Sequence, residues 1–310
     1  MKVSIIIPNF NGEQILNKNL PSVLSAMREY GDCELIIVDD GSLDDSVLLV
    51  ERLILENKTF DIKLFKNERN KGFSSAVNTG ASIAKGEIFL LLNSDVSPSL
   101  DFIKFLASDF IDDQIFAVGC LDKSIEKEKI IERGRGIGKI VRGFLMHGRG
   151  DTGKKNTLWA AGGSSAFRKE IWEKLSGMDE IYSPFYWDDI DLSYRALKSG
   201  YKVLFEKRSV VEHRHFEGAI RKNFSEGKVK RIAYRNQIIF SWKNFDKINL
   251  FSHIFWLPYH FSLAILRLDF NFLAGFFMAI LRIPKVIESR SKAFLLFILK
   301  DEEVLKDLEK

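Results

Sequence analysis

The chain has little cysteine, little net charge and no uninterrupted apolar run long enough to cross a bilayer. Its two cysteines, Cys33 and Cys120, cannot form the disulfide framework of a small secreted domain, so a reducing compartment fits. The formal net charge is only +4 among 310 residues, and we expect no nucleic-acid partner. A spanning helix needs about 20 consecutive apolar residues, whereas polar residues or proline interrupt both apolar stretches near the C-terminus.

The sequence also shows no internal repeat, no low-complexity tract and no secretory signal. It opens directly on a strand-like segment, residues 3–8, without the basic and apolar regions of a signal peptide. We therefore expect a cytoplasmic protein. The hydrophobic fraction of 46% is ordinary for a globular protein and supports one large or two modest domains.

Short β-rich apolar runs alternate with helical segments in the first third of the chain. Four such runs end at turn residues, as buried parallel strands do: residues 3–7, 34–38, 62–65 and 88–92. Helices are predicted from about residue 14 to Tyr30, after Asp45, and from Phe73 to Gly86. This alternation predicts an α/β fold with a parallel sheet and right-handed crossovers.

Polar residues and glycines follow each of these strands. They are Pro8, Asn9 and Asn11; Asp39 and Asp40; Asn70, Gly72 and Phe73; and Asn93, Ser94 and Asp95. The carboxyl ends of parallel strands are where open α/β sheets bind ligands, and a carboxylate there can hold a cation that in turn holds phosphate oxygens. The structural alternative is that these residues only form turns or cap helices.

Four segments in this order and spacing resemble the family-two inverting glycosyltransferases of the GT-A fold, and in particular the bacterial rhamnosyltransferase-like members. The segments are SIIIPNFN (4–11), IIVDDGS (36–42), NKGF (70–73) and LNSD (92–95). The resemblance covers about residues 1–240. It implies a GT-A-like, Rossmann-type mixed sheet with flanking helices, followed by a C-terminal helical region at 241–310.

The resemblance also assigns a donor site. In the family, the first Asp after the second strand reads the nucleotide base, which is Asp39 here, and the Asn-x-Gly-Phe segment supports the nucleotide pocket. The family's Asp-x-Asp motif contacts ribose through its first position and a metal through its last. Asp95 matches the last position, whereas Asn93 departs from Asp at the first: its amide can bond a ribose hydroxyl but supplies no charge.

The segment FYWDDIDLSYR (185–195) matches the catalytic part of the family. The resemblance makes Asp189 the general base and Asp188 the residue that orients the acceptor, while Asp191 suits a pair with Arg195. Capping of a first helical turn is the structural alternative. The acceptor side matches Trp159, Gly162, Gly163 and Trp187.

A histidine completes the metal site in related enzymes, and His213 matches it, with His215 as the adjacent competitor. We therefore expect Mn²⁺ or Mg²⁺ to be held by Asp95 and His213. The glycine-rich, cationic residues 133–155 are predicted to be a loop, either solvated or in contact with phosphates.

Aromatic and apolar residues dominate residues 250–260 and 270–281. Cations flank them: Arg267, Arg282, Lys285, Arg290 and Lys292. This pattern predicts helices that lie on a membrane surface, peripheral on the inner face of the cell membrane. A helical packing module or a homodimer surface is the alternative.

Together, these patterns predict a metal-dependent inverting glycosyltransferase. Its donor would be a dTDP- or UDP-linked sugar and its acceptor a glycan or lipid-linked hydroxyl in cell-surface polysaccharide synthesis. Two alternatives stay open. A nucleotidyltransferase would carry a cationic, glycine-rich loop after the first strand, which residues 8–12 lack. A catalytically weak membrane scaffold is favoured by Asn93 and opposed by Asp95, Asp189 and His213 together.

Overall fold

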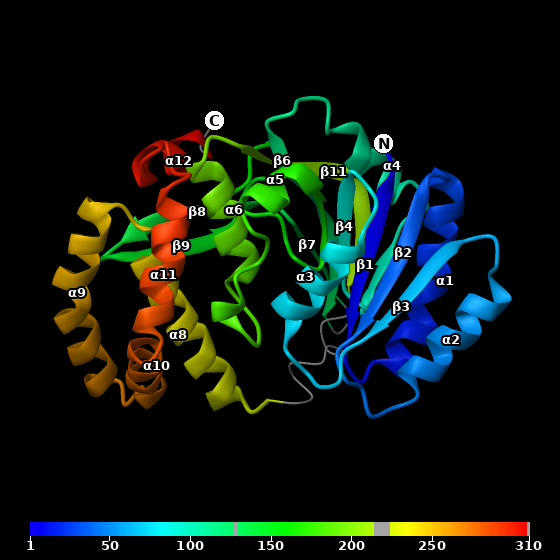
Figure 1. Cartoon of the computed structure of the whole chain (residues 1–310). Coiled ribbons are helices and arrows are strands. Elements are labelled where there is room, and N and C mark those ends of the chain that lie inside the picture. Colours follow the sequence, from blue (N-terminus) through cyan, green and yellow to red (C-terminus); the bar gives the residue numbers. More distant parts are fainter. Residues whose placement is uncertain (127–128, 214–223, 309–310) are drawn as a thin grey trace.

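The computed structural model describes residues 1–126, 129–213 and 224–308, with helices on both faces of a mixed sheet and a helical layer at one end (Figure 1). The described strands lie in the order β3-β2-β1-β4-β10-β6-β11-β5, and β7 pairs with the last residues of β6. Their bounds are β1 (Val3–Asn9), β2 (Cys33–Asp39), β3 (Asp61–Lys66), β4 (Ile88–Leu92), β5 (Val96–Pro98), β6 (Ile115–Glu126), β7 (Lys129–Arg133), β10 (Ser164–Arg168) and β11 (Lys202–His213).

The four strands predicted from the first third of the chain all form and are mutually parallel. β10 runs antiparallel between β4 and β6, and β11 is parallel to β6. The expected Rossmann-type mixed sheet with flanking helices is therefore confirmed.

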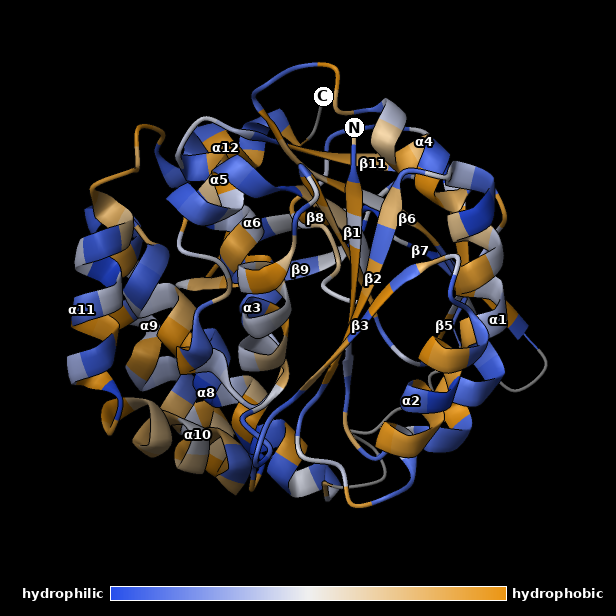
Figure 2. Cartoon of the chain, turned by 45° about the vertical axis from the view of Figure 1, so that its right-hand side comes forward, coloured by the Kyte–Doolittle hydropathy of each residue, from blue (hydrophilic) through white to orange (hydrophobic). Residues whose placement is uncertain are grey.

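Alternate residues of the central strands pack against helices on opposite faces. The helices that cover the sheet are α1 (Glu13–Tyr30), α2 (Ser46–Glu56), α3 (Phe73–Ile83), α4 (Phe102–Ser108), α5 (Lys169–Lys174) and α6 (Asp188–Lys198). Ile5 and Ile7 pack with α1, α2 and α4, whereas Ile6 packs with α3, α5 and α6. Burial on both faces explains why the middle of these strands is continuously apolar, as the orange parts of β1 and β2 in Figure 2 show.

The sequence predicts two helix ends from glycines, at Gly31 and Gly86, and only the first is found there. α1 ends as predicted at Gly31, which adopts a φ of 88° and donates its N–H to the Met27 carbonyl. α3 ends before the predicted Gly86, because the backbone N–H groups of Lys85 and Gly86 bond the side chains of Glu34 and Ser4 instead. A long-range contact thus outweighs the local helix pattern.

The glycine-rich residues 133–155 are not a loop, so that prediction is wrong. Most of them form an antiparallel hairpin of β8 (Gly136–Val141) and β9 (Phe144–Arg149). Arg135 is buried at its base, where its guanidinium donates to the Asn156 and Leu308 carbonyls at 2.7 and 2.6 Å.

The helical region consists of α8 (Glu226–Asn244), α9 (Lys247–Leu266), α10 (Phe270–Ile280), α11 (Ile283–Phe294) and α12 (Asp301–Asp307). The proposed domain boundary at residue 240 lies within α8, which packs Ile238 and Phe240 against Tyr182 and Trp187 of the preceding part. The helical region therefore shares a core with the segment that carries the predicted catalytic residues.

Many large apolar side chains of the helical region stay exposed. They include Ile248, Phe251, Ile254, Phe255, Ile265, Leu266, Leu268, Phe270, Phe277, Leu281, Ile287, Leu295 and Ile298. No single helix in the described ranges is long and apolar enough to cross a bilayer. Only α10 and α11 together reach that length and composition, and they are bent by 69°.

Buried ionic contacts connect the helical region to α6. Lys198, at the end of α6, donates to Asp301 at 2.5 Å, and both side chains are almost fully buried. The same carboxylate accepts from Tyr194, Asn249 and the Asp246 backbone N–H at 2.9 Å each. Asp301 therefore joins α6, α9 and α12.

Asp301→Ala should lower the free energy of unfolding by about 3–5 kcal/mol, because it leaves the buried Lys198 ammonium without its carboxylate. The neighbouring Glu302 is a matched control, since its ion pair with Lys306 is exposed, and Glu302→Ala should cost less than about 1 kcal/mol. Urea denaturation of both variants measures the difference. Equal losses would contradict the assigned role of Asp301.

Candidate active site

The ends of β1 and β2 bring the first predicted donor residues together. Asn9 lies directly opposite Asp39 in the strand register, and its amide donates to the buried Asp39 carboxylate at 3.1 Å. Asp39 also accepts the Ser42 backbone N–H at 2.9 Å. Asn11 accepts the Leu43 N–H and accordingly holds the facing loop. Pro8 lies within β1, one residue before Asn9.

Asp40 forms hydrogen bonds with the loop that precedes α3. Its carboxylate accepts the backbone N–H groups of Lys71 and Gly72 and the Asn67 amide, all within 3.1 Å. Asp40 therefore holds the loop that begins α3. Gly72 starts this helix with a φ of 95°, a conformation that favours glycine, and Phe73 is the first helical residue. Asn70, in the same loop, is exposed.

The Asn93-Ser94-Asp95 turn meets the predicted acceptor segment. The Asn93 backbone N–H donates to the Gly163 carbonyl at 2.8 Å, and a Cβ on Gly163 would lie only 2.4 Å from the Asn93 amide nitrogen. The neighbouring Gly162 donates its N–H to the Asp189 carboxylate at 3.2 Å. The two glycines thus place the predicted base beside the predicted ribose-binding turn.

The two catalytic candidates begin α6, and both carboxylates lie toward α3 and the glycine segment. Asp188 is buried and accepts the Ser74 hydroxyl of α3 at 2.8 Å. Tyr186 and Trp187, just before them, both have positive φ angles, of 69° and 74°. Such a backbone is strained for residues other than glycine and occurs often at functional sites.

Asn236 of α8 supports this strained turn. Its fully buried amide donates to the carbonyls of Tyr182, Phe185 and Tyr186 at 2.7–2.9 Å. The prediction from sequence missed Asn236, because no local pattern places a residue of α8 beneath a loop fifty residues earlier.

Burial raises the pKa of both Asp188 and Asp189. The negative charge of Asp189 raises the pKa of Asp188 further, to about 7, although the Ser74 hydrogen bond opposes the shift. Hydrogen bonds from Gly162 and Ile190 and the nearby His147 counteract the rise for Asp189. A carboxylate with a raised pKa is a stronger base, which suits proton removal near neutral pH.

Asp95 and His213 meet through the pairing of β5 with β11. The His213 Nε2 lies 3.3 Å from the Asp95 carboxylate, while its Nδ1 lies 3.0 Å from Asp122 of β6. Burial lowers the pKa of His213, but the bonds to Asp122 and Asp95 outweigh this and raise it to about 9. His215 lies outside the described residues.

Asp122 is a second residue that the sequence did not reveal. In metal sites, a carboxylate commonly orients the histidine ligand through the ring nitrogen that faces away from the metal, and Asp122 has this position. Among the described residues, no group of three or more His, Cys, Asp or Glu side chains forms a complete metal centre.

An aromatic group lies beside Asp189. The His147 ring of β9 packs edge-on against Trp159 and Trp187, with ring centroids 5.3 and 5.1 Å apart. His147 and Asp189 also interact electrostatically, since Asp189 opposes the lowering of the His147 pKa by burial. His147, which the β8–β9 hairpin places here, therefore contacts two of the predicted acceptor residues, Trp159 and Trp187.

The family model for glycosyl transferase family 2 matches residues 4–176. The chain belongs to this family. It is 27% identical over 226 residues to the O-antigen chain rhamnosyltransferase RfbN of Salmonella typhimurium, which covers 69% of this chain and 67% of RfbN. It is 38% identical over 93 residues to the Escherichia coli UDP-Glc:alpha-D-GlcNAc-diphosphoundecaprenol beta-1,3-glucosyltransferase WfgD, covering 30% and 34% of the two chains.

The first two curated relatives are matched over only 40% and 28% of their own length. Among solved structures, GalNAc-T7 with UDP, GalNAc and Mn²⁺ superposes with a TM-score of 0.62 at 20% identity, covering 80% of this chain and 48% of that one. This likeness confirms the expected GT-A fold.

Asp188 should make the free energy of unfolding depend on pH. Between its ordinary value of 3.8 and its folded value of about 7, the folded state keeps a proton that the unfolded state has released, so stability falls as pH rises. Asp188→Asn removes this titration. The free energy of unfolding of this variant minus that of the native protein should be about 2 kcal/mol larger at pH 8 than at pH 5. Urea unfolding of both proteins at the two pH values measures this difference. A difference independent of pH would contradict the raised pKa.

Proposed function

We propose that this protein transfers a sugar from a nucleoside-diphosphate sugar to a hydroxyl acceptor, with inversion at the anomeric carbon. The observation that carries the proposal is the Asp189 carboxylate, bonded through Gly162 to the segment that also holds Asn93. A base on the acceptor side thus adjoins a turn at the expected donor site. The family membership supports the same activity.

The donor residues fit a nucleotide. The Asp39 carboxylate is suited to accept a base imide N–H, and the Asn93 amide to bond a ribose hydroxyl. UDP- and dTDP-sugars both carry such an imide. For the acceptor, we propose a glycan or lipid-linked hydroxyl in cell-surface polysaccharide synthesis, which is supported by the substrates named for RfbN and WfgD.

Asp95 and His213 fit a divalent cation such as Mn²⁺ or Mg²⁺. Their oxygen and nitrogen donors face each other, Asp122 orients the imidazole, and the diphosphate would supply further oxygens. When bound, the cation would offset the negative charge that develops on the departing diphosphate. The Mn²⁺ in the GalNAc-T7 structure supports this assignment.

The remaining chemistry belongs to the carboxylates. Asp189 removes the acceptor proton as the oxygen attacks the anomeric carbon from the face opposite the leaving group. The Ser74 hydroxyl holds Asp188, which orients the acceptor. The transition state should have oxocarbenium-ion character at the donor sugar, as in glycosidases. Aromatic rings such as those of Trp159 and Trp187 suit the acceptor side because they present apolar area to the C–H face of a sugar.

A scaffold function is the second candidate, because Asn93 replaces the carboxylate of the family motif. Hydrolysis of a nucleotide sugar in the presence of Mn²⁺ separates the two. The enzyme should release nucleoside diphosphate from at least one donor, whereas a scaffold releases none from any.

We also propose that the protein works on the inner face of the cell membrane. The exposed aromatic and aliphatic side chains of α9 and α10, such as Phe251, Phe255 and Phe270, would enter the lipid interface. A homodimer that buries the same face is the alternative, and sedimentation with and without vesicles distinguishes them.

Asp189→Asn should lower turnover at saturating acceptor by about a hundred- to ten-thousand-fold, because the amide has the size of the carboxylate but cannot take a proton. Donor affinity should change little, since the proposed donor contacts lie at Asp39 and Asn93. Asp188→Asn is the control and should lose less, mainly through acceptor affinity. If only Asp188→Asn is inactive, the base is assigned one residue too late.

Asp95→Ala should abolish, and His213→Ala should weaken, the Mn²⁺-dependent binding of UDP or dTDP. Asp122→Asn should weaken it about 10- to 100-fold, since it only orients the imidazole. Calorimetry with and without Mn²⁺ measures all three, and Asp113→Ala, which removes an exposed carboxylate, is the control. Unchanged Mn²⁺ dependence in the Asp95 and His213 variants would remove the metal assignment.

A further inference from the structure

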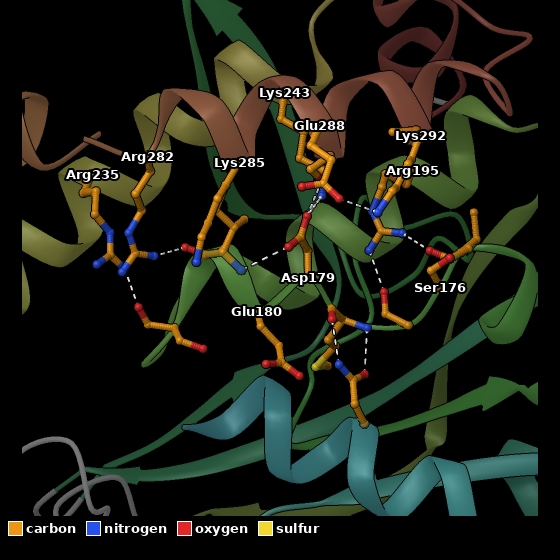
Figure 3. Close-up of a pocket in the computed structure, with 18 of the residues that line it drawn as sticks. Ser176, Asp179, Glu180, Arg195, Arg235, Lys243, Arg282, Lys285, Glu288 and Lys292 are labelled. Carbon is orange, nitrogen blue, oxygen red and sulfur yellow. Dashed lines mark hydrogen bonds and ion pairs between the residues drawn. The ribbon is translucent and has the colours of Figure 1, made fainter. Parts of the chain in front are cut away.

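A separate cavity of about 980 Å³ lies between α3, the segment before α6 and the helix α11 (Figure 3). Its described lining includes none of the residues assigned above to donor, acceptor, metal or catalysis. A volume of this order suits a small organic ligand rather than a single inorganic ion. The proposed sugar transfer therefore leaves this cavity without a role.

Positive charge dominates the cavity wall. The described lining has seven cationic side chains: Lys71, Arg195, Arg235, Lys243, Arg282, Lys285 and Lys292. Only three acidic side chains accompany them: Asp179, Glu180 and Glu288. Asp179 bonds Lys243 at 2.7 Å, and Glu288 bonds Lys292 at 2.7 Å.

Two guanidinium groups that line the cavity, those of Arg235 and Arg282, have no carboxylate partner among the described residues. Arg235 is only 2% exposed, and within the described chain it donates to the Tyr182 and Ser183 carbonyls and to a side-chain amide. Arg282 donates to the Ile181 carbonyl. Burial and the nearby Arg282 lower the pKa of Arg235 to about 9, as expected for two cations without an anion between them.

Lys285 follows Arg282 by three residues and lines the same cavity (Figure 3). It is exposed and forms no hydrogen bond or ion pair with the residues that the structure describes. Buried cations without a counter-ion are unfavourable, and guanidinium groups match phosphate oxygens especially well. The cavity is therefore suited to a phosphate group.

The cavity also has an apolar margin. Leu281 and Leu296 line it although they are 82% and 40% exposed. Ile287 on α11 and Leu295 just after it are 60% and 86% exposed. A small soluble phosphate compound has no hydrocarbon to bury against these side chains, whereas the acyl chains of a lipid would be stabilised by contact with them.

We propose that this cavity binds the phosphate headgroup of an anionic phospholipid, with its acyl chains against the exposed apolar side chains of α10 and α11. The phosphate lies between Arg235, Arg282 and Lys285. This site is independent of sugar transfer, and it would give the membrane association a specific lipid preference.

The test is flotation of the full chain with vesicles of phosphatidylcholine alone or mixed with phosphatidylglycerol. Lys285→Gln and Arg282→Gln should each weaken binding to the anionic vesicles at least about 20-fold, because each removes a charge-assisted contact to the bound phosphate as well as one charge near the membrane. Binding to phosphatidylcholine should not change. Lys285 has no described partner, so this variant should fold normally, as circular dichroism and UDP binding would show.

Arg267→Gln is the matched control. Arg267 lies next to the exposed Leu266 and Leu268 but outside the cavity lining, and its loss should weaken binding by at most about fivefold, the contribution of one charge near a membrane. If Arg267→Gln costs as much as Lys285→Gln, attraction to the membrane is diffuse and the headgroup site is wrong.

Calorimetry with inorganic phosphate and glycerol phosphate separates the two sources of a phosphate group. Both should bind far more weakly than the anionic vesicles do. If glycerol phosphate binds as tightly as vesicles and competes with them through Lys285, the occupant is a soluble phosphate compound, and the assignment to a lipid is overturned.

Discussion

The buried carboxylate of Asp191 is the contact on which the rest of the site depends. It accepts hydrogen bonds from Tyr182, Arg195, Lys243 and Asn244, at 2.7–2.8 Å. Burial alone would raise its pKa, but Lys243 and Arg195 lower it, so the charged form is stable inside the protein. One carboxylate thereby joins the loop before α6, α6 itself and the end of α8.

Because of this contact, the helical region and the catalytic segment form one structural unit. Asp191 lies in the first turn of α6, two residues after Asp189. Lys243 and Asn244 donate hydrogen bonds to this turn, and Asn236 donates to carbonyls of the strained loop before it. The helices after residue 225 therefore position the proposed base, in addition to any role at a membrane.

The sequence predicts most of the fold and the donor side of the site, because both depend on local patterns. Apolar runs and turn residues locate β1, β2, β3 and β4, and the polar residues after them necessarily meet at one edge of the sheet. The pair of Asp191 with Arg195 is likewise local, four residues apart on one helix, and it forms as expected.

The features that were missed depend on long-range pairing. Asp122 reaches His213 only because β6 pairs with β11, and His147 reaches Trp159 only because residues 136–149 form a hairpin. Glycine and cations in that stretch indicate a loop by composition, yet the pairing of backbone groups and the buried Arg135 stabilise strands there. No periodicity in the sequence encodes such contacts.

The central claim is direct attack on the anomeric carbon by an acceptor hydroxyl that Asp189 has deprotonated. The most direct test is the anomeric configuration of the sugar in the transfer product, determined by proton NMR of the new glycosidic bond, which does not mutarotate. The account predicts that the new glycosidic bond has the configuration opposite to that of the sugar in the donor. A product with the donor's configuration would contradict single displacement and the role of Asp189.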